Sequence, residues 1–278
     1  MTFTLVPATP RTFRSRIGWV ISDTWVITCR DLAHWRRQPA ALIANTLVFP
    51  VMIVLMFGYL LGGAMTVPGG GDYREFLVPG MFAMTMVFGT GATLSAVSAD
   101  AARGITDRFR SMPMATPAVI AGRAAADMLN SAAALAVLAG CGFLVGWQPH
   151  RGAARAAAAL GLLLLLRFAL LWIGVYLGLR CYASPEALTA VRTLEFPIGF
   201  LGNPFVAVAT MPAWLGAVAL WNPLSSTVTA ARQLFGDPVG ANSYWITSHA
   251  ILMATAWPLF ITAIFFTLSV HQYRNLSS

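Results

Sequence analysis

The sequence predicts an all-α integral membrane protein with six transmembrane helices in a single domain over residues 1–278. Of its residues 58% are hydrophobic and only 10% are charged. The mean hydropathy is +0.70, so there is too little polar surface to coat a soluble globule. Apolar stretches of about 20 residues or more, the length that crosses about 30 Å of hydrocarbon, occur near 40–63, 76–98, 118–146, 153–179, 187–209 and 247–270.

The charged residues predict the orientation of these spans. All 18 basic residues are arginines, against 10 acidic residues, which gives a formal net charge of +8. The arginines gather before the first span and after the second, so the positive-inside rule places both termini and the 100–117 loop in the cytoplasm. The basic balance therefore indicates topology and contact with membrane lipids, and no nucleic acid partner is predicted. Without lysine the chain cannot form a Walker-type ATPase site of its own.

Cysteine and histidine give no sign of a metal site or a catalytic group. The 3 cysteines are separated by long stretches of sequence, and the 4 histidines lie in different segments without ligand spacing. The prediction is therefore a chain with no catalytic residues, no bound metal and no cofactor of its own.

Two segments outside the spans have recognisable patterns. Residues 13–37 combine an apolar stripe that includes Trp25 and Trp35 with arginines opposite, which predicts an amphipathic helix lying in the membrane interface. Residues 211–236 contain two apolar pieces divided by Asn222 and Pro223, each too short to cross a bilayer. They predict a re-entrant helical hairpin between spans five and six. Ordinary interfacial packing of two short helices is the alternative.

The loop after the second span, DAARGITDRFRSMP at 100–113, has the pattern of a short amphipathic helix. Ile105, Phe109 and Met112 fall on one face, and Pro113 ends the helix. Such a helix is suited to contact a soluble partner. A solvated, positively charged loop that obeys membrane topology is the alternative.

Ionisable residues inside the expected spans need partners. Arg123 and Asp127, one turn apart in the third span, are expected to pair, and Arg167 of the fourth span is a second possible partner of Asp127. We interpret these three as a structural charge network. Arg192 and Glu195 of the fifth span are candidates for the entrance to a substrate path, with a structural pair as the alternative.

The order of the elements, the segment DRFRSMP and the stretch LEFPIGFLGNPFVAVATMPAWLGAVALWNPLSSTVTAARQLFG resemble the type-2 ABC transporter permeases, especially their daunorubicin-resistance branch. The resemblance implies that 100–113 is the coupling helix that docks on a separate ATPase. The implied docking residues are Ile105, Asp107, Arg108, Phe109 and Arg110. The fifth span departs from the family pattern, because its proline, Pro204, comes early.

The resemblance also implies how the protein works. It implies export of a hydrophobic or amphipathic drug, antibiotic or lipid across a bacterial cytoplasmic membrane. Two ABC ATPase subunits would bind ATP and Mg²⁺, and a second permease subunit, identical or homologous, would complete the path. The path would run near the first, second and fifth spans, with Arg192, Glu195 and Asn203 as candidate path residues.

Three other functions are weighed against this one. A polysaccharide or glycolipid ABC permease shares the same architecture. An ion-coupled secondary transporter would use Asp127 or Glu195 as its titrating carboxylate, although no clear internal repeat is present. An intramembrane enzyme is disfavoured, because the histidines and carboxylates do not form a convergent set in the sequence.

Overall fold

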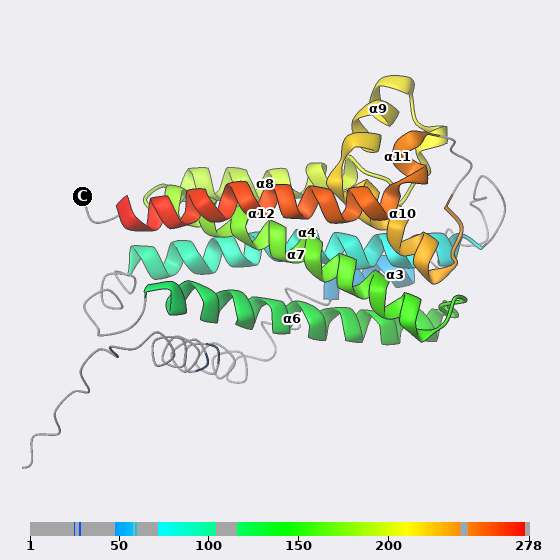
Figure 1. Ribbon diagram of the computed structural model, residues 1–278, viewed down its shortest axis with the longest axis horizontal. Coiled ribbons are helices and arrows are strands. Elements are labelled where there is room, and N and C mark those ends of the chain that lie inside the picture. The colour runs from blue at the N-terminus through cyan, green and yellow to red at the C-terminus, as the bar shows by residue number, and fades with distance from the viewer. Residues whose placement is uncertain are drawn as a thin grey trace, which may run out of the picture.

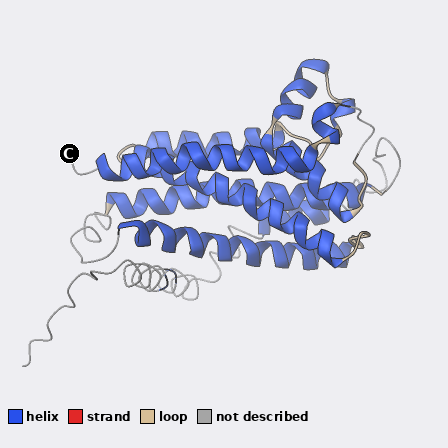
Figure 2. Cartoon of the chain, in the orientation of Figure 1, coloured by secondary structure: helices blue, strands red, loops and turns tan. Residues whose placement is uncertain are grey.

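The computed structural model describes residues 25, 28, 48–57, 59, 72–103, 116–239 and 244–275. Within these residues the chain is helical, with turns and irregular segments between helices and no strand (Figures 1 and 2). The elements are α3 (Phe49–Met56), α4 (Tyr73–Ala102), α6 (Thr116–Val145), α7 (Ala153–Cys181), α8 (Pro185–Phe200), the 3-10 helix η3 (Val208–Thr210), α9 (Ala213–Trp221), α10 (Pro223–Phe235), α11 (Trp245–Ser248) and α12 (Ala250–Asn275).

Four of the described helices are long and apolar enough to cross a membrane. They are α4, the Ala121–Val145 part of α6, α7, and the Ala250–Tyr273 part of α12. They coincide with the second, third, fourth and sixth expected spans, and they run alongside one another (Figure 1). Of the first expected span, 40–63, the structure describes α3 and a few flanking residues, so six spans remain a prediction.

The fifth expected span, 187–209, is shorter than the sequence predicts. α8 has 16 residues, which is about 24 Å of helix against about 30 Å of hydrocarbon. The chain leaves the helix after Phe200, and Pro204 has no amide to continue it. The irregular segment 201–207 packs against α4, where a Cβ on Gly80 would lie closer than 3.0 Å to the Pro204 backbone. A tertiary contact therefore replaces the end of the expected helix.

The break between the two short helices falls where the sequence predicts it. α9 ends at Trp221, and the Asn222 side chain caps α10 by accepting a hydrogen bond from the Leu224 amide at 2.9 Å. Pro223 occupies the first helical position of α10. In Figure 1, α9 and α11 lie together at one end of the bundle, beside α10. Insertion of α9 and α10 into the bilayer as a re-entrant hairpin stays a prediction.

The core is centred on α4. In its most apolar stretch 78% of the residues are buried, against 11% in α12, so α4 is surrounded by protein while α12 presents apolar side chains outward. Phe82 of α4 makes T-shaped contacts with the rings of Trp147 and Phe235, with centroid distances of 5.3 and 6.1 Å. α4 is therefore the most buried of the four long helices.

A buried arginine joins α10 to this core. The guanidinium of Arg232 is 0% exposed and donates to the carbonyls of Phe76, Asn203 and Pro204 at 2.7 to 3.1 Å. Its carbon lies 3.5 Å from the centroid of the Phe76 ring. The Asn203 and Pro204 carbonyls lie in the irregular segment after α8 and have no helical donor. The Arg232 side chain of α10 supplies their hydrogen bonds. No pattern in the sequence predicted this role of Arg232.

Two predicted elements fall largely outside the described residues. Of the interfacial helix 13–37, the structure describes Trp25, which is 63% exposed, and Thr28, which is buried. The Thr28 hydroxyl donates to the Gly122 carbonyl of α6 at 3.1 Å, so this segment touches the bundle at that point. The five predicted docking residues of the coupling helix lie in 104–115, outside the described residues.

Candidate functional site

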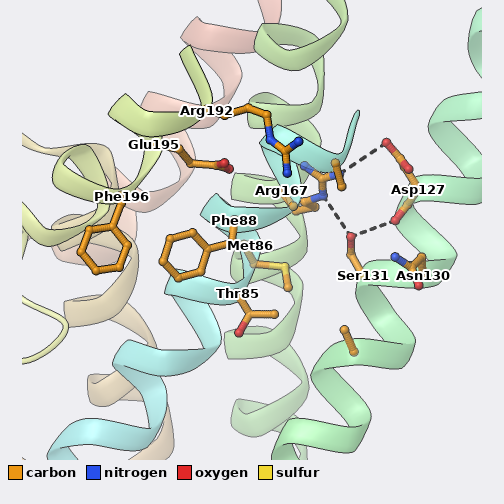
Figure 3. A pocket seen from close by; sticks show the side chains of 13 residues that line it. Thr85, Met86, Phe88, Asp127, Asn130, Ser131, Arg167, Arg192, Glu195 and Phe196 are labelled. Atoms are coloured by element: carbon orange, nitrogen blue, oxygen red, sulfur yellow. Dashed lines mark hydrogen bonds and ion pairs between the residues drawn. The ribbon is translucent and has the colours of Figure 1, made fainter. Parts of the chain in front are cut away.

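A cavity of about 290 Å³ lies among α4, α6, α7 and α8 (Figure 3). It combines aromatic and aliphatic side chains with two arginines and two carboxylates, an arrangement typical of a site that binds a molecule with both apolar and polar parts. Its lining residues are Thr85, Met86, Phe88, Gly89, Ala92, Asp127, Asn130, Ser131, Ala134, Arg167, Arg192, Glu195 and Phe196.

The polar wall of the cavity is organised around Arg167 of α7. This side chain is 2% exposed, and its Nε donates to the Ser131 hydroxyl at 3.0 Å. Its Nη2 donates to the Thr93 hydroxyl at 2.6 Å and lies 3.4 Å from Asp127 Oδ2. The Thr93 hydroxyl in turn donates to the Asp127 carboxylate at 2.5 Å. Among the described residues, the remaining nitrogen, Nη1, is buried and has no hydrogen-bond partner.

Two glycines of α4 make room for these charged groups. A Cβ on Gly89 would lie 2.9 Å from the guanidinium carbon of Arg167, and a Cβ on Gly91 would collide with the Glu195 carboxylate. Instead, the Gly91 amide donates to Glu195 Oε1 at 2.9 Å. Glycine at these positions therefore lets charged side chains of α7 and α8 lie directly against the α4 backbone.

α8 forms the opposite side of the cavity. Glu195 is partly buried, Arg192 is exposed one turn earlier, and Phe196 stacks on Phe88 of α4 with a centroid distance of 6.1 Å. Figure 3 shows the Arg192 and Glu195 side chains of α8 directed toward Arg167, with the Phe88 and Phe196 rings next to each other. The cavity thus joins a charged part to an aromatic part.

The structure confirms one expected ion pair and corrects another. Asp127 contacts Arg167, as predicted across the third and fourth spans. The predicted pair of Arg123 with Asp127 is not formed within the described residues, because Arg123 instead contacts Asp100 of α4 at 2.6 Å. Arg123 therefore pairs with Asp100 at the end of α4 and not with Asp127, its neighbour one turn along α6.

The candidate path residues separate into two places. Arg192 and Glu195 line the cavity together with Asp127 and Arg167, which the sequence treated as a separate structural network. Asn203 lies elsewhere: its amide nitrogen Nδ2 donates to the Thr229 hydroxyl at 2.9 Å, and it is not among the residues lining the cavity.

The sequence reasoning missed Thr93 and Ser131, which bond Arg167 directly. The available sequence signals were weak: Ser131 lies one turn after Asp127 on α6, and Thr93 lies among small residues of α4. The residues that line the cavity include hydroxyl, amide, carboxylate and guanidinium groups but no histidine or cysteine.

The bundle of long apolar helices, with a cavity between them, indicates a polytopic membrane protein. Residues 22–235 match the model of the ABC-2 type transporter family. The chain is also 30% identical over 256 residues to the daunorubicin resistance ABC transporter permease protein DrrB1 of Streptomyces coeruleorubidus, an alignment that covers 92% of this chain and 87% of that protein. The chain therefore belongs to the ABC-2 type transporter family, as a permease subunit of an ABC transporter.

Proposed function

We propose that this chain is the transmembrane subunit of an ATP-driven exporter that moves a hydrophobic or amphipathic molecule out of the cytoplasm or the inner leaflet. The observation that carries the proposal is the cavity among α4, α6, α7 and α8, which holds charged and aromatic groups within a bundle of apolar helices. A drug, an antibiotic or a lipid has this combination of chemistry.

The connection between α4 and α6 supports the coupling part of the proposal. α4 and α6, which supply Gly89 and Asp127 to the cavity lining, are consecutive described helices, and the segment expected to dock on the ATPase lies between them in the sequence. Near that segment the Arg123 and Asp100 side chains tie the two helices together at 2.6 Å. A displacement of the segment would therefore reach both walls of the cavity through stiff helices.

The balance of charge favours an amphipathic substrate. The cavity has two cationic side chains, Arg167 and Arg192, and two carboxylates, Asp127 and Glu195, so no single formal charge dominates it. The stacked rings of Phe88 and Phe196 offer an aromatic surface beside them. Because the relative named above is a daunorubicin resistance protein, daunorubicin is the first substrate to test.

The proposed assembly has two ABC ATPase subunits and a second permease subunit, identical or homologous. ATP and Mg²⁺ bind at the ATPase subunits, and this chain lies in a bacterial cytoplasmic membrane with both termini in the cytoplasm. The arginine-rich ends and the 100–117 loop support this orientation.

The test uses proteoliposomes that contain the chain and an ATPase subunit from the same genome. The measurements are co-purification of the two proteins and ATP-dependent daunorubicin transport, in wild type and in the double variant Phe109→Asp, Arg110→Glu. Arg180→Glu, at the exposed end of α7, makes a similar charge change elsewhere and serves as the control. We expect loss of ATPase binding and of transport in the double variant only.

The outcome separates the alternatives. Transport that persists without the ATPase and stops when an ion gradient is dissipated would replace the ABC mechanism with an ion-coupled one. ATPase binding without daunorubicin transport, but with transport of a lipid-linked glycan, would keep the mechanism and change the cargo to that of a glycolipid permease.

A further inference from the structure

Three potential metal ligands gather at the end of the bundle away from the 104–115 connection. Glu75 lies in the first turn of α4, His150 in the turn between α6 and α7, and Asp237 just after α10. One ligand atom from each lies within 4.8 Å of the other two, and His150 Nε2 is 2.8 Å from Glu75 Oε1. The three residues come from distant parts of the chain, which is why the scattered histidines of the sequence gave no metal prediction.

The surrounding structure holds these three residues in place. The Trp147 ring nitrogen donates to Asp237 Oδ2 at 2.9 Å, which fixes one oxygen of that carboxylate. The His150 amide donates to the Phe235 carbonyl at 2.7 Å, so the turn that carries the imidazole is bound to the end of α10. Gly236, with φ of 90°, lets the chain reverse where a side chain would meet the Cβ of His150. Outer hydrogen bonds of this kind orient metal ligands in known sites.

Asp237 provides a second, independent observation. It is 4% exposed, and its other carboxylate oxygen, Oδ1, is buried without a hydrogen-bond partner among the described residues. A buried carboxylate oxygen that lacks a donor is costly, and an ion is one of the few groups that satisfy it. The Trp147 bond leaves this oxygen available to a cation.

We propose that Glu75, His150 and Asp237 form a binding site for a divalent transition-metal ion with the chemistry of Zn²⁺. One imidazole and two carboxylates suit such an ion, with water as the fourth ligand. Tetrahedral ligands about 2.0 Å from zinc are roughly 3.3 Å apart, so His150 and Glu75 need to separate by about half an ångström, and ligand atoms that lie as far as 4.8 Å apart need to approach by up to about 1.5 Å. Their side chains are 49% and 27% exposed, which leaves them free to do so and lets water reach the site.

The bound ion would join three elements that are distant in sequence. It would fix the start of α4, the α6–α7 turn and the end of α10 at one point, beside the Arg232 contacts to Phe76. The site would therefore stabilise this end of the bundle, and this role is independent of ATPase coupling.

The experiment is a zinc titration of the full chain, purified without a polyhistidine tag, by isothermal titration calorimetry. His150→Ala and Asp237→Asn remove ligands. His249→Ala, an exposed histidine at the α11–α12 junction, is the matched control. We expect one Zn²⁺ per wild-type chain, unchanged binding in the control, and a dissociation constant raised at least about tenfold in the two ligand variants. Mn²⁺ and Ca²⁺ are titrated for comparison.

Thermal unfolding keeps the test decisive if Asp237→Asn folds poorly, although its amide oxygen can still accept the Trp147 bond. Zinc should raise the unfolding temperature of the wild type and of His249→Ala but not of His150→Ala, because a ligand stabilises the state that binds it. The proposal is overturned if the wild type binds no zinc, or if His150→Ala binds it as tightly as the wild type does.

Discussion

Two fully buried arginines serve different parts of this molecule. Arg232 of α10 donates only to backbone carbonyls, those of Phe76, Asn203 and Pro204, and lies over an aromatic ring. Arg167 of α7 bonds side chains only, the hydroxyls of Thr93 and Ser131 and the Asp127 carboxylate. Both are almost inaccessible, at 0% and 2% exposure, so burial alone does not distinguish their roles.

The two arginines differ in whether their hydrogen-bond partners could be exchanged for a bound molecule. The partners of Arg232 are backbone carbonyls of α4 and of the packed irregular segment, which cannot turn away by a change of side-chain rotamer. The partners of Arg167 are side chains that can change rotamer, its Nη1 has no partner among the described residues, and it lines a cavity. We infer that Arg232 holds the fold and that Arg167 is able to exchange a partner for a substrate.

The largest expected effect is on stability, from Arg232→Met. Methionine keeps much of the apolar contact with Phe76 but removes four hydrogen bonds to three carbonyls, of which those of Asn203 and Pro204 lie outside any helix, and an unpaired buried carbonyl costs about 1–3 kcal/mol. We expect a loss of several kcal/mol, seen as a large fall in unfolding temperature and in the yield of monodisperse protein. Arg232→Lys should fall between, because an ammonium does not span the same carbonyls. A variant as stable as the wild type would remove the distinction between the two arginines.

The second effect is on transport, from Arg167→Met. Methionine removes the cation from the cavity while Asp127 keeps its hydrogen bond from Thr93, so the carboxylate is not left alone. We expect daunorubicin transport to fall at least about tenfold, with a smaller loss of stability than in Arg232→Met, because fewer backbone groups lose donors. Transport in proteoliposomes and thermal unfolding of the same preparations measure both. Full transport with a large loss of stability would make Arg167 structural.

The sequence predicted those features that depend on local pattern. Long apolar stretches located α4, α6, α7 and α12, and the Asn222 cap with Pro223 located the start of α10. Contacts between residues that are distant in the sequence leave no such local pattern. The end of α8 depends on the contact of Pro204 with Gly80. Arg123 pairs with Asp100 and not with Asp127. Arg232 bonds backbone carbonyls, which every residue has and which no sequence pattern marks. The residues Glu75, His150 and Asp237 meet only after three segments have packed together.

The smallest effect compares one hydroxyl from each region. Ser131 accepts a hydrogen bond from Arg167 Nε at 3.0 Å, whereas Ser226 of α10 is 3% exposed and its hydroxyl has no partner among the described residues. Ser131→Ala should cost about 1 kcal/mol and lower transport, because Arg167 loses a group that orients it. Ser226→Ala should change stability by less than about 0.5 kcal/mol and leave transport unchanged, because no bond is lost. Equal losses in the two variants, measured by thermal unfolding and daunorubicin transport, would show that the Arg167 network adds nothing beyond ordinary packing.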